Sequence, residues 1–393
     1  MTRHDRPRVL IVAGYFDWFS GYQETVLARA FSQVADTNVL AGNRVSPIFS
    51  DDHLAKVGAS RIYPAGECYE NDVLVTRLPI REIRSMVWSR RVPSLVQNGS
   101  YDLVVQVMPG QLFPALASIP RVKHRVALYG DNAAMYAALG PIQSRIKFAA
   151  FSATKGLIYW TVNRRASRAY GYTMDTITRL RHFAPSGMEV LPLAFDREEF
   201  YFSRETRSAA RAELNYDDDD LVVIAAGKVQ PQKCISSVVE SIASYRQREP
   251  RVRLIIVGMD SGEESCRIRK HVEDSGISDI TLSFPFVDAR RLNELFNAAD
   301  VGIWPTMPAI TIQQAMGTGL QVIIPRNQFT DHLLRGSSSA HEIAPRPEGI
   351  SIGIRTAQRM KSASDMPRCV HAKSNEAFSG RRVVERLLED LSR

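Results

Sequence analysis

Short runs of apolar, mostly β-branched residues alternate along the chain with stretches in which apolar residues recur at helical spacing. An apolar run that ends at a turn residue is typical of a strand buried on both faces of a parallel sheet. The chain opens with such a run at residues 8–14, and a helical pattern follows at 21–31. Further strands are expected at 72–76, 101–106 and 125–129. This alternation predicts an open α/β sheet.

A second series of the same kind begins near residue 220. The strands expected in it are 221–227, 252–258, 280–284, 300–304 and 320–325, and the helices are 236–245, 288–299 and 312–318. Residues 192–196 lie between the two series and are the expected hinge. We therefore predict an α/β fold of two Rossmann-like, doubly wound domains, 1–195 and 196–375, facing each other across a cleft.

Ligands of such sheets bind beyond the carboxyl ends of the strands. The loops expected to line the cleft are therefore those after Val12, Ala226, Val257 and Trp304.

The composition changes this picture little. The chain has 393 residues, of which 45% are hydrophobic and 23% charged, which excludes a disordered tail, a collagen-like repeat and a disulfide-stapled miniprotein. The four cysteines lie far apart without a C-x-x-C pair, so reduced thiols are expected. The chain contains no apolar run of about 18 residues and its start has no signal-peptide core, which predicts a cytoplasmic protein.

The charge balance points to anionic partners. Lys and Arg number 50 against 42 for Asp and Glu, a net charge of +8. Phosphates, acidic lipids and nucleic acid all fit such a surplus. No nucleic-acid recognition motif accompanies it, so nucleic acid is not expected as a partner.

Two stretches in the second series carry candidate chemistry. Residues 227–233, G-K-V-Q-P-Q-K, leave a buried strand with a lysine near each end of a short loop, which suits a diphosphate. Two solvated surface lysines are the alternative interpretation. Residues 304–319 form a strand end, a proline-rich loop and a helix, with amides near Ala309, Ile310 and Thr311 at the helix start, which suits an anion. Thr311 could instead be a plain N-cap.

These stretches, in this order, resemble the retaining nucleotide-sugar glycosyltransferases of the GT-B fold. Residues 227–233 are similar to the G-R-L-x-P-E-K loop of that family, 254–258 to its I-V-G strand, 295–305 to L-Y-x-x-A-D-V-x-V-x-P, and 314–323 to E-A-M-A-C-G-x-P-V-I. Residues 21–24 resemble its first-loop G-G-x-E, and 191–200 resemble I-P-N-G-V-D-x-x-x-F. The resemblance implies that 376–393 is a C-terminal helix crossing back to the first domain.

The resemblance also implies roles for single residues. Lys228 and Lys233 would be the catalytic cations, which neutralise the donor diphosphate and stabilise the leaving nucleoside diphosphate without metal. The implied donor-binding residues are Gly21, Gly227, Gly258, Ala309, Ile310, Thr311 and Gln314. Gln314 would hold the ribose hydroxyls through its amide oxygen.

The chain departs from the family pattern at three positions. The paired glutamates of the family, E-x7-E, fall at Thr306 and Gln314, and no carboxylate lies between them. The H-G or H-D motif of the first domain appears as Tyr129-Gly-Asp131, which makes Tyr129 and Asp131 the candidates for the acceptor or sugar side. These departures leave open a catalytically weak relative.

Two other features each have a structural and a functional interpretation. Residues 145–168 mix basic and aromatic residues, either as a helix with an aromatic face in the core or as a contact for acidic lipid head groups. Residues 217–220 are four aspartates at the amino end of a strand, for which a solvated turn is favoured over a metal site.

The sequence thus predicts a retaining, metal-independent glycosyltransferase without a cofactor. Its substrate would be a nucleoside diphosphate sugar, with UDP or GDP undecided, and its acceptor a hydroxyl of a glycan or lipid in polysaccharide or glycolipid biosynthesis. The alternatives are a nucleotide- or glycan-binding relative that supports an active partner, and a sugar-nucleotide epimerase. A peripheral contact with acidic membrane at its inner face is a further expectation.

Overall fold

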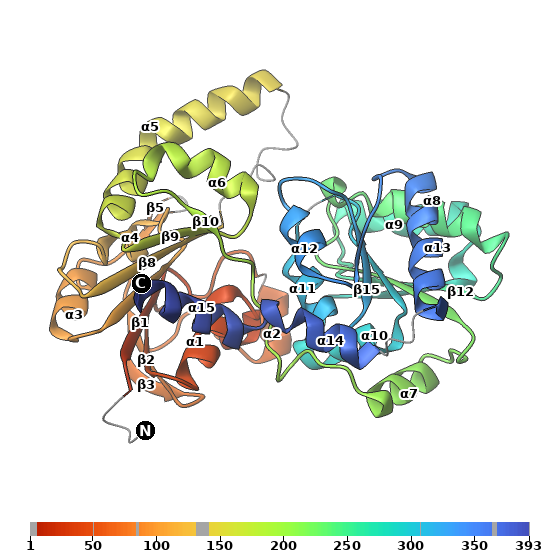
Figure 1. Cartoon of the computed structure of the whole chain (residues 1–393), viewed down its shortest axis with the longest axis horizontal. Coiled ribbons are helices and arrows are strands. Elements are labelled where there is room, and N and C mark those ends of the chain that lie inside the picture. Colours follow the sequence, from red (N-terminus) through yellow and green to blue (C-terminus); the bar gives the residue numbers. More distant parts are fainter. Residues whose placement is uncertain are drawn as a thin grey trace. The chain divides into compact units, whose positions relative to one another are not determined.

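The computed structural model describes residues 6–49, 51–83, 86–130, 141–306, 308–363 and 368–392. The chain divides into two compact units (Figure 1). Unit 1 comprises residues 1–192 and 380–393, and unit 2 comprises 193–379. The expected boundaries, after 195 and 375, lie three and four residues from these.

An eight-stranded sheet forms the centre of unit 1, with strand order β10-β9-β8-β7-β1-β2-β4-β3. Its strands are β1 (Arg8–Ala13), β2 (Asp36–Gly42), β3 (Gly66–Glu70), β4 (Val73–Leu78), β7 (Leu103–Val107), β8 (His124–Tyr129), β9 (Arg168–Gly171) and β10 (Glu189–Val190). All neighbours are parallel except β3, which pairs with β4 in antiparallel register. A separate hairpin joins β5 (Arg81–Ile83) and β6 (Met86–Trp88).

The residues of the central strands β1, β7 and β8 are buried except Arg8 and His124 at the strand starts, as expected for a sheet covered by helices on both faces. The helices of unit 1 are α1 (Gln23–Ser32), α2 (Asp51–Val57), α3 (Val92–Asn98), α4 (Leu112–Leu116), α5 (Pro141–Arg165), α6 (Met174–Leu180) and α15 (Gly380–Ser392). The last of these, α15, packs against α1. The C-terminal segment therefore completes the first unit of the chain rather than the second.

Unit 2 contains a six-stranded sheet that is parallel throughout, in the order β13-β12-β11-β14-β15-β16. Its strands are β11 (Leu221–Ala226), β12 (Val252–Val257), β13 (Thr281–Phe284), β14 (Val301–Ile303), β15 (Gln321–Ile324) and β16 (Ala340–Glu342). Its helices are α7 (Arg204–Glu213), α8 (Ile235–Arg246), α9 (Glu263–Asp274), α10 (Ala289–Ala298), α11 (Ile310–Gly317), α12 (Asp331–Gly336), α13 (Pro347–Ala363) and α14 (Arg368–Ser374).

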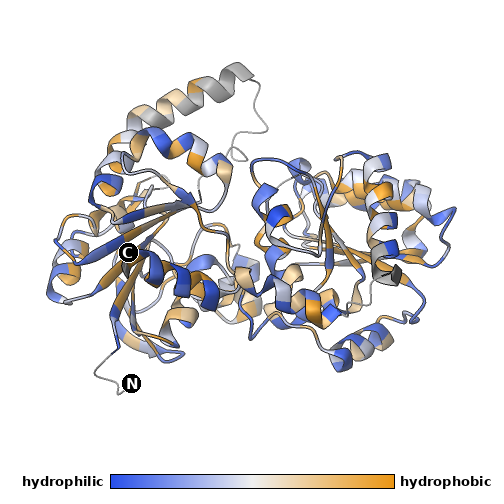
Figure 2. Ribbon diagram, in the orientation of Figure 1, coloured by the Kyte–Doolittle hydropathy of each residue, from blue (hydrophilic) through white to orange (hydrophobic). Residues whose placement is uncertain are grey.

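Strand β11 shows how this sheet forms. All six of its residues are buried, and alternate residues face opposite sides. Val223 and Ala225 pack with α8 and α13, whereas Val222 and Ile224 pack with α10 and α11. Figure 2 shows the same concentration of apolar residues in the strands of both sheets. The apolar run is continuous in the sequence because both of its faces lie in a core.

Three arginines satisfy the carbonyl groups at the end of α10. Arg207 donates to the carbonyls of Asn297, Ala298 and Ala299, Arg211 to that of Ala298, and Arg368 to those of Phe296, Asn297 and Ala299. Arg211 and Arg207 also pair with the buried Asp300 carboxylate, at 3.4 and 2.8 Å. Cations at a helix C-terminus are favoured by the unpaired carbonyls and the helix dipole.

The four aspartates at 217–220 lie next to these arginines. Arg211 donates to the backbone carbonyls of Asp217 and Asp220. Asp220 pairs with Arg253 at 3.1 Å, and the exposed Asp219 pairs with Arg251 at 3.0 Å. These two carboxylates pair with different arginines, and the run is the turn that leads into β11.

Candidate functional site

The loop after β11 and the loop after β12 are in backbone contact. Gly227 donates its amide to Val257 at 3.1 Å, and Val229 donates to Gly258 at 3.3 Å. Gly227 and Gly258 have φ angles of +132° and +102°, which favour glycine. A Cβ atom on Gly258 would lie 2.3 Å from the carbonyl oxygen of Gly227. The two predicted glycines are therefore required by the backbone at this edge of the sheet.

Lys233 closes the loop after β11. A 3-10 turn, Pro231–Lys233, ends at Cys234 in the left-handed region, and α8 begins at the next residue. The ammonium of Lys233 donates to the carbonyl of Pro308 at 2.9 Å. Burial lowers the pKa of Lys233 to about 8. Since Ala309 precedes α11, the structure brings this lysine and the start of α11 together, as the sequence predicts.

Lys228 occupies a different environment in the same loop. Its side chain is exposed, and its charge acts on the carboxylate of Asp260 in the loop after β12. Hydrogen bonds from Ser265 and from the amide of Gly262, together with Lys228, lower the pKa of Asp260. Lys233 is thus the interior cation of the loop and Lys228 the solvent-side cation. Asp260 is a neighbour that sequence reasoning missed.

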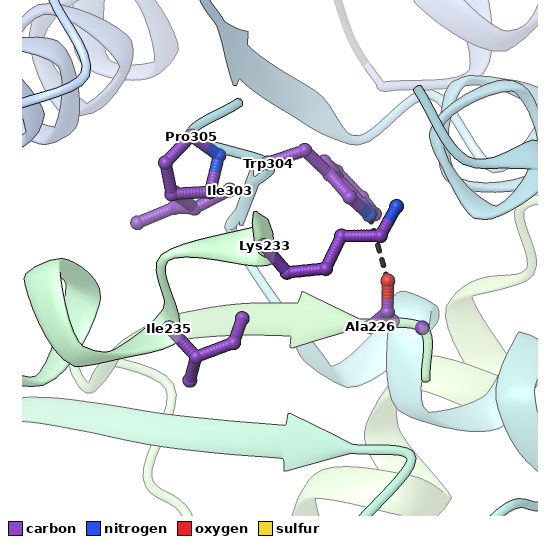
Figure 3. A pocket seen from close by; sticks show the side chains of 7 residues that line it. Ala226, Lys233, Ile235, Ile303, Trp304 and Pro305 are labelled. Atoms are coloured by element: carbon purple, nitrogen blue, oxygen red, sulfur yellow. Dashed lines mark hydrogen bonds between the residues drawn. The ribbon is translucent and has the colours of Figure 1, made fainter. Parts of the chain in front are cut away.

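The start of α11 is tied to the ends of two strands. The indole N–H of Trp304 donates to the Ala226 carbonyl at 2.7 Å (Figure 3). The hydroxyl of Thr311 donates to the same oxygen at 2.8 Å and lies 3.0 Å from the indole nitrogen. Ala309 is the N-cap residue, so the interpretation of Thr311 as a plain N-cap is wrong. The first amides of α11 have no partner within the helix, which suits an anion.

A small cavity lies between these elements. Figure 3 shows Lys233 extending past Trp304 toward the end of β11. The cavity is lined by Ala226, Gly227, Lys233, Ile235, Ile303, Trp304 and Pro305. Because most of its wall is apolar, the Lys233 ammonium is desolvated there, and it donates to the protein backbone.

Thr306 and Gln314 stand at the two glutamate positions of the family pattern. Thr306 is hydrogen-bonded within the protein, and Gln314 is buried. The Thr306 hydroxyl donates to the carbonyl of Gln232 at 2.5 Å, which links the loop before α11 to the lysine loop. Gln314 lies three residues after Thr311 on α11, on the same face of the helix, and is buried. Its neighbour Gln313 is 3% exposed, and its side-chain oxygen has no hydrogen-bond partner among the described residues.

The predicted residues of unit 1 have other surroundings. Gly21 ends a short 3-10 turn with φ +61°, and no atom lies within 4 Å of a Cβ built on it, so backbone conformation explains this glycine. Tyr129 is fully buried, packs against Tyr159 and donates its hydroxyl to Asn163 at 2.7 Å. Its side chain therefore belongs to the core of unit 1. Asp131 lies outside the described residues.

Two carboxylates near the end of β1 did not stand out in the sequence as a pair. Burial raises the pKa of Asp17 to about 6 and that of Glu24 to about 7. One oxygen of Asp17 has no hydrogen-bond partner among the described residues. Perturbed carboxyls at the carboxyl end of a parallel strand are candidates for function. Their pairing depends on the loop conformation, which no motif fixes.

Within the described residues, no group of three or more His, Cys, Asp or Glu side chains gathers as a metal site. In the same part of the chain, no helix has both the length and the apolar character needed to cross a bilayer.

Comparison with known proteins connects this site to a family. A family model described as Glycosyl transferases group 1 matches residues 206–339, which contain the lysine loop and α11. A D-inositol 3-phosphate glycosyltransferase of Pseudarthrobacter chlorophenolicus is 31% identical over 162 residues, or 40% of this chain and 36% of that protein. A protein of that name from Streptomyces griseus is 30% identical over 127 residues. The chain spans about a third of the length of these curated relatives.

Solved structures match nearly the whole chain. Sucrose-phosphate synthase from Thermosynechococcus elongatus aligns with a TM-score of 0.68 at 15% identity, covering 98% of both chains. HepE from Anabaena, solved in complex with UDP and glucose, aligns with a TM-score of 0.68 at 16% identity, covering 98% of this chain and 99% of that one. At this level of identity the likeness shows the fold, which is the GT-B architecture that the sequence resemblance implies.

Proposed function

We propose that this chain, a GT-B protein with a glycosyl transferases group 1 segment at residues 206–339, transfers a sugar from a nucleoside diphosphate sugar to a hydroxyl acceptor. The acceptor class we propose is a growing glycan or a glycolipid, and the configuration of the transferred sugar is retained. UDP is the first nucleotide to test, because HepE, with the same fold, was solved with UDP-glucose.

One observation carries this proposal. The Lys233 ammonium lies 2.9 Å from the Pro308 carbonyl, directly ahead of α11, at the carboxyl ends of the parallel strands β11 and β14. A cation and unpaired helix amides at one point form a site for a diphosphate. We infer that the diphosphate takes the place of the Pro308 carbonyl as the partner of Lys233.

The chemistry follows from the charges. As the bond from the sugar to the diphosphate breaks, negative charge grows on the leaving oxygen. Lys233 from the interior and Lys228 from the solvent side then stabilise that charge more strongly than in the bound substrate. The two cations supply the countercharge, so transfer is expected to proceed in the presence of EDTA. Strict dependence on manganese or magnesium would contradict this role for the lysines.

The proposal is tested by binding and turnover on one protein. Calorimetry with UDP, GDP and ADP identifies the nucleotide, and incubation with the matching nucleotide sugars measures hydrolysis and transfer. Nuclear magnetic resonance of the first product gives the configuration of the new bond. Transfer with retained configuration supports the proposal, and the absence of nucleotide binding would overturn it.

A second candidate function rests on the two missing glutamates. Thr306 carries no charge, and its hydroxyl is bound to Gln232 rather than being available to a sugar. A chain that binds a nucleotide or glycan and supports an active partner would keep the diphosphate site and lose this contact. Nucleotide binding without turnover on any tested donor would favour that function.

A further inference from the structure

A cluster of two imidazoles and one amide lies between α14 and the strands β15 and β16 of unit 2. The amide nitrogen of Gln321, the first residue of β15, lies 3.2 Å from Nε2 of His371 on α14. The amide oxygen of Gln321 bonds to Nε2 of His341 on β16. Nδ1 of His371 lies 3.2 Å from the hydroxyl of Ser338. Gln321 and His371 are each 7% exposed, so one buried glutamine bridges two histidines from different elements.

The hydrogen bonds of this amide determine where the protons of both rings lie. The amide nitrogen of Gln321 only donates, so Nε2 of His371 accepts, and the proton of that ring lies on Nδ1, toward Ser338. The amide oxygen only accepts, so Nε2 of His341 carries a proton. The bonds therefore require His371 to be neutral, and the two neutral rings are opposite tautomers.

A second proton on His371 breaks this arrangement. It would place two donors face to face, the Nε2–H group of the ring and the amide N–H group of Gln321. Rotating the amide by half a turn would satisfy His371 but would turn its N–H group toward the proton on His341. The amide has a single oxygen and cannot present it to both rings. Burial lowers the pKa of both rings, and the charge of His371 lowers the pKa of His341 further.

The carboxylates around the cluster are engaged elsewhere. The elements packed against α14, β15 and β16 are α11, α12, α13, β14 and the 3-10 turn Asn375–Phe378. Three carboxylates on these elements pair with arginines: Asp331 with Arg326 and Arg335, Glu342 with Arg326, and Glu376 with Arg197. Glu348 is exposed in the first turn of α13. The other titratable residues there are His332, Arg355, Arg359, Arg368, Cys369 and Lys373. Within the described residues, no carboxylate balances a charge on either ring.

Helix α14 holds the C-terminal end of α11. Arg368, at the start of α14, donates to the carbonyl and to the hydroxyl of Thr318 at 2.8 and 3.1 Å. Asn375, directly after α14, donates to the carbonyl of Met316 at 2.9 Å. A Cβ atom on Gly319 would collide with the carbonyl of Arg368, so the turn after α11 and the first turn of α14 are in close contact. Helix α14 therefore supports the helix whose first turn belongs to the candidate site.

We propose that His341, Gln321 and His371 form an acid-sensitive latch, which holds α14 on unit 2 while both rings are neutral and releases it when both are protonated. The released segment takes up protons near pH 6.5, the ordinary pKa of histidine, whereas the docked form resists them. Docking is therefore complete above about pH 6.5 and is lost as the pH falls below it. Release removes the bonds of Arg368 and Asn375 from the end of α11. This proposal does not rest on the proposed sugar transfer, and its test uses no donor.

The test is hydrogen–deuterium exchange of the full chain between about pH 7.5 and pH 5, with exchange times scaled to the intrinsic rate at each pH. We expect the amides of residues 368–374 to lose protection below about pH 6.5, by up to about a hundredfold per pH unit, because release takes up two protons. The amides of α9, in the same unit, should stay protected. Unchanged protection of α14 at the acid end would overturn the proposal, and so would a simultaneous loss in α9, which would mean that unit 2 unfolds as a whole.

Substitutions in the cluster test the role of the bridge. Gln321→Glu offers a carboxylate oxygen to each ring, so it should keep α14 protected down to about pH 5. The double change His341→Gln and His371→Gln removes both titrating groups and should flatten the pH profile. His182→Gln, at an exposed histidine of unit 1, is the matched control and should behave as wild type. A wild-type profile in Gln321→Glu or in the double variant would overturn the proposal.

Nuclear magnetic resonance of isotope-labelled imidazoles gives a second readout on the unaltered chain. At about pH 7.5 we expect neutral rings, with the proton on Nδ1 of His371 and on Nε2 of His341. Both rings should become charged over the same pH range in which α14 loses protection. A charged His371 at neutral pH, or the opposite tautomer of either ring, would show that the amide of Gln321 does not hold the rings in this way and would overturn the proposal.

Discussion

Lys233 and Lys228 lie five residues apart in one loop, yet only Lys233 is partly buried and hydrogen-bonded to the protein backbone. The buried ammonium has already lost most of its hydration, so it gains more from a phosphate oxygen than an exposed lysine does. The diphosphate therefore depends on Lys233 first and on Lys228 second.

Replacing Lys233 with alanine tests this order. We expect Lys233→Ala to weaken nucleoside diphosphate binding by at least about 1.5 kcal/mol, a loss of more than tenfold, and Lys228→Ala to weaken it less. Isothermal calorimetry at constant salt measures both constants. Lys270→Ala, on the exposed face of α9, is the control for a lost surface charge. Unchanged affinity in both loop variants would remove the site assignment.

The burial of Lys233 also makes binding depend on pH. Its pKa is lowered to about 8, so the free protein loses this charge as the pH rises through that value. The diphosphate binds the charged form, and the dissociation constant is therefore expected to rise between about pH 7 and pH 9.5, by up to about tenfold per pH unit. Lys233→Arg keeps its charge throughout and should flatten the curve. A rise of equal size in that variant would assign the effect to another group.

Gln314 tests whether the ribose contact survives without a carboxylate. An amide oxygen accepts one neutral hydrogen bond, so Gln314→Ala should raise the dissociation constant of the donor several-fold, as expected for a loss of about 1 kcal/mol. Gln314→Glu should preserve or tighten binding, since a carboxylate accepts hydrogen bonds more strongly. Equal affinity in the wild type and both variants would show that the contact has been lost, and would favour the binding function without catalysis.

At the scale of elements, the site depends on two loops that approach backbone to backbone. Gly258→Ala would place a methyl group 2.3 Å from the Gly227 carbonyl at a φ of +102°. One loop must then shift, and we expect a loss of about 3 kcal/mol of stability in unit 2 together with weaker nucleotide binding. Urea unfolding and calorimetry measure the two effects.

Gly276→Ala is the matched control for this change. Gly276 has a φ of +66°, but no atom lies within 4 Å of the added Cβ. Only the backbone strain remains, so we expect unit 2 to lose about 1 kcal/mol of stability without a change in nucleotide affinity. Equal losses of stability in the two variants would mean that the close approach of the two loops at Gly258 adds nothing to the cost of the substitution.

The elements of the site were predictable from the sequence to different degrees. β11 and β12 are apolar runs that are each followed by a glycine, so the hydrophobic pattern predicted where each strand ends. The carboxyl ends of adjacent parallel strands lie at the same edge of a sheet. The bond from Trp304 and Thr311 to Ala226 was not predictable, because it depends on the approach of α11 to the strand ends. Tyr129 ends a strand buried on both faces, where periodicity cannot tell which side a residue takes.

On the scale of the whole molecule, the hydrophobic pattern did not predict the strands that are not apolar runs. β3 is largely exposed, and β5 is fully exposed. Both pair in antiparallel register beside the apolar β4 or β6, so the backbone of a neighbour rather than their own side chains places them. The return of the C-terminal helix to unit 1 came from the family resemblance. Its amphipathic pattern alone does not say which unit it covers.

The packing of α15 on unit 1 leads to a prediction about the stability of the two units. Val383, Val384 and Leu387 of α15 are 3%, 1% and 0% exposed, and Gly380 approaches Val26 and Ala30 of α1. Asp390 accepts a hydrogen bond from Tyr170 at 2.7 Å, and Arg386 pairs with Glu189. All of these partners belong to unit 1. Burial of three such side chains contributes about 4–9 kcal/mol.

Removal of residues 380–393 should therefore lower the unfolding temperature of unit 1 strongly, while unit 2 keeps its nucleotide affinity within about twofold. Scanning calorimetry, with and without nucleotide, separates the two because only the transition of unit 2 shifts upward with ligand. Leu387→Ala should reproduce part of the effect, about 2–4 kcal/mol, whereas Arg382→Ala, which breaks an exposed ion pair with Glu385, should change little. Loss of nucleotide binding on truncation would show that α15 supports unit 2 as well, and the nucleotide site would then depend on more of the chain than its own sheet.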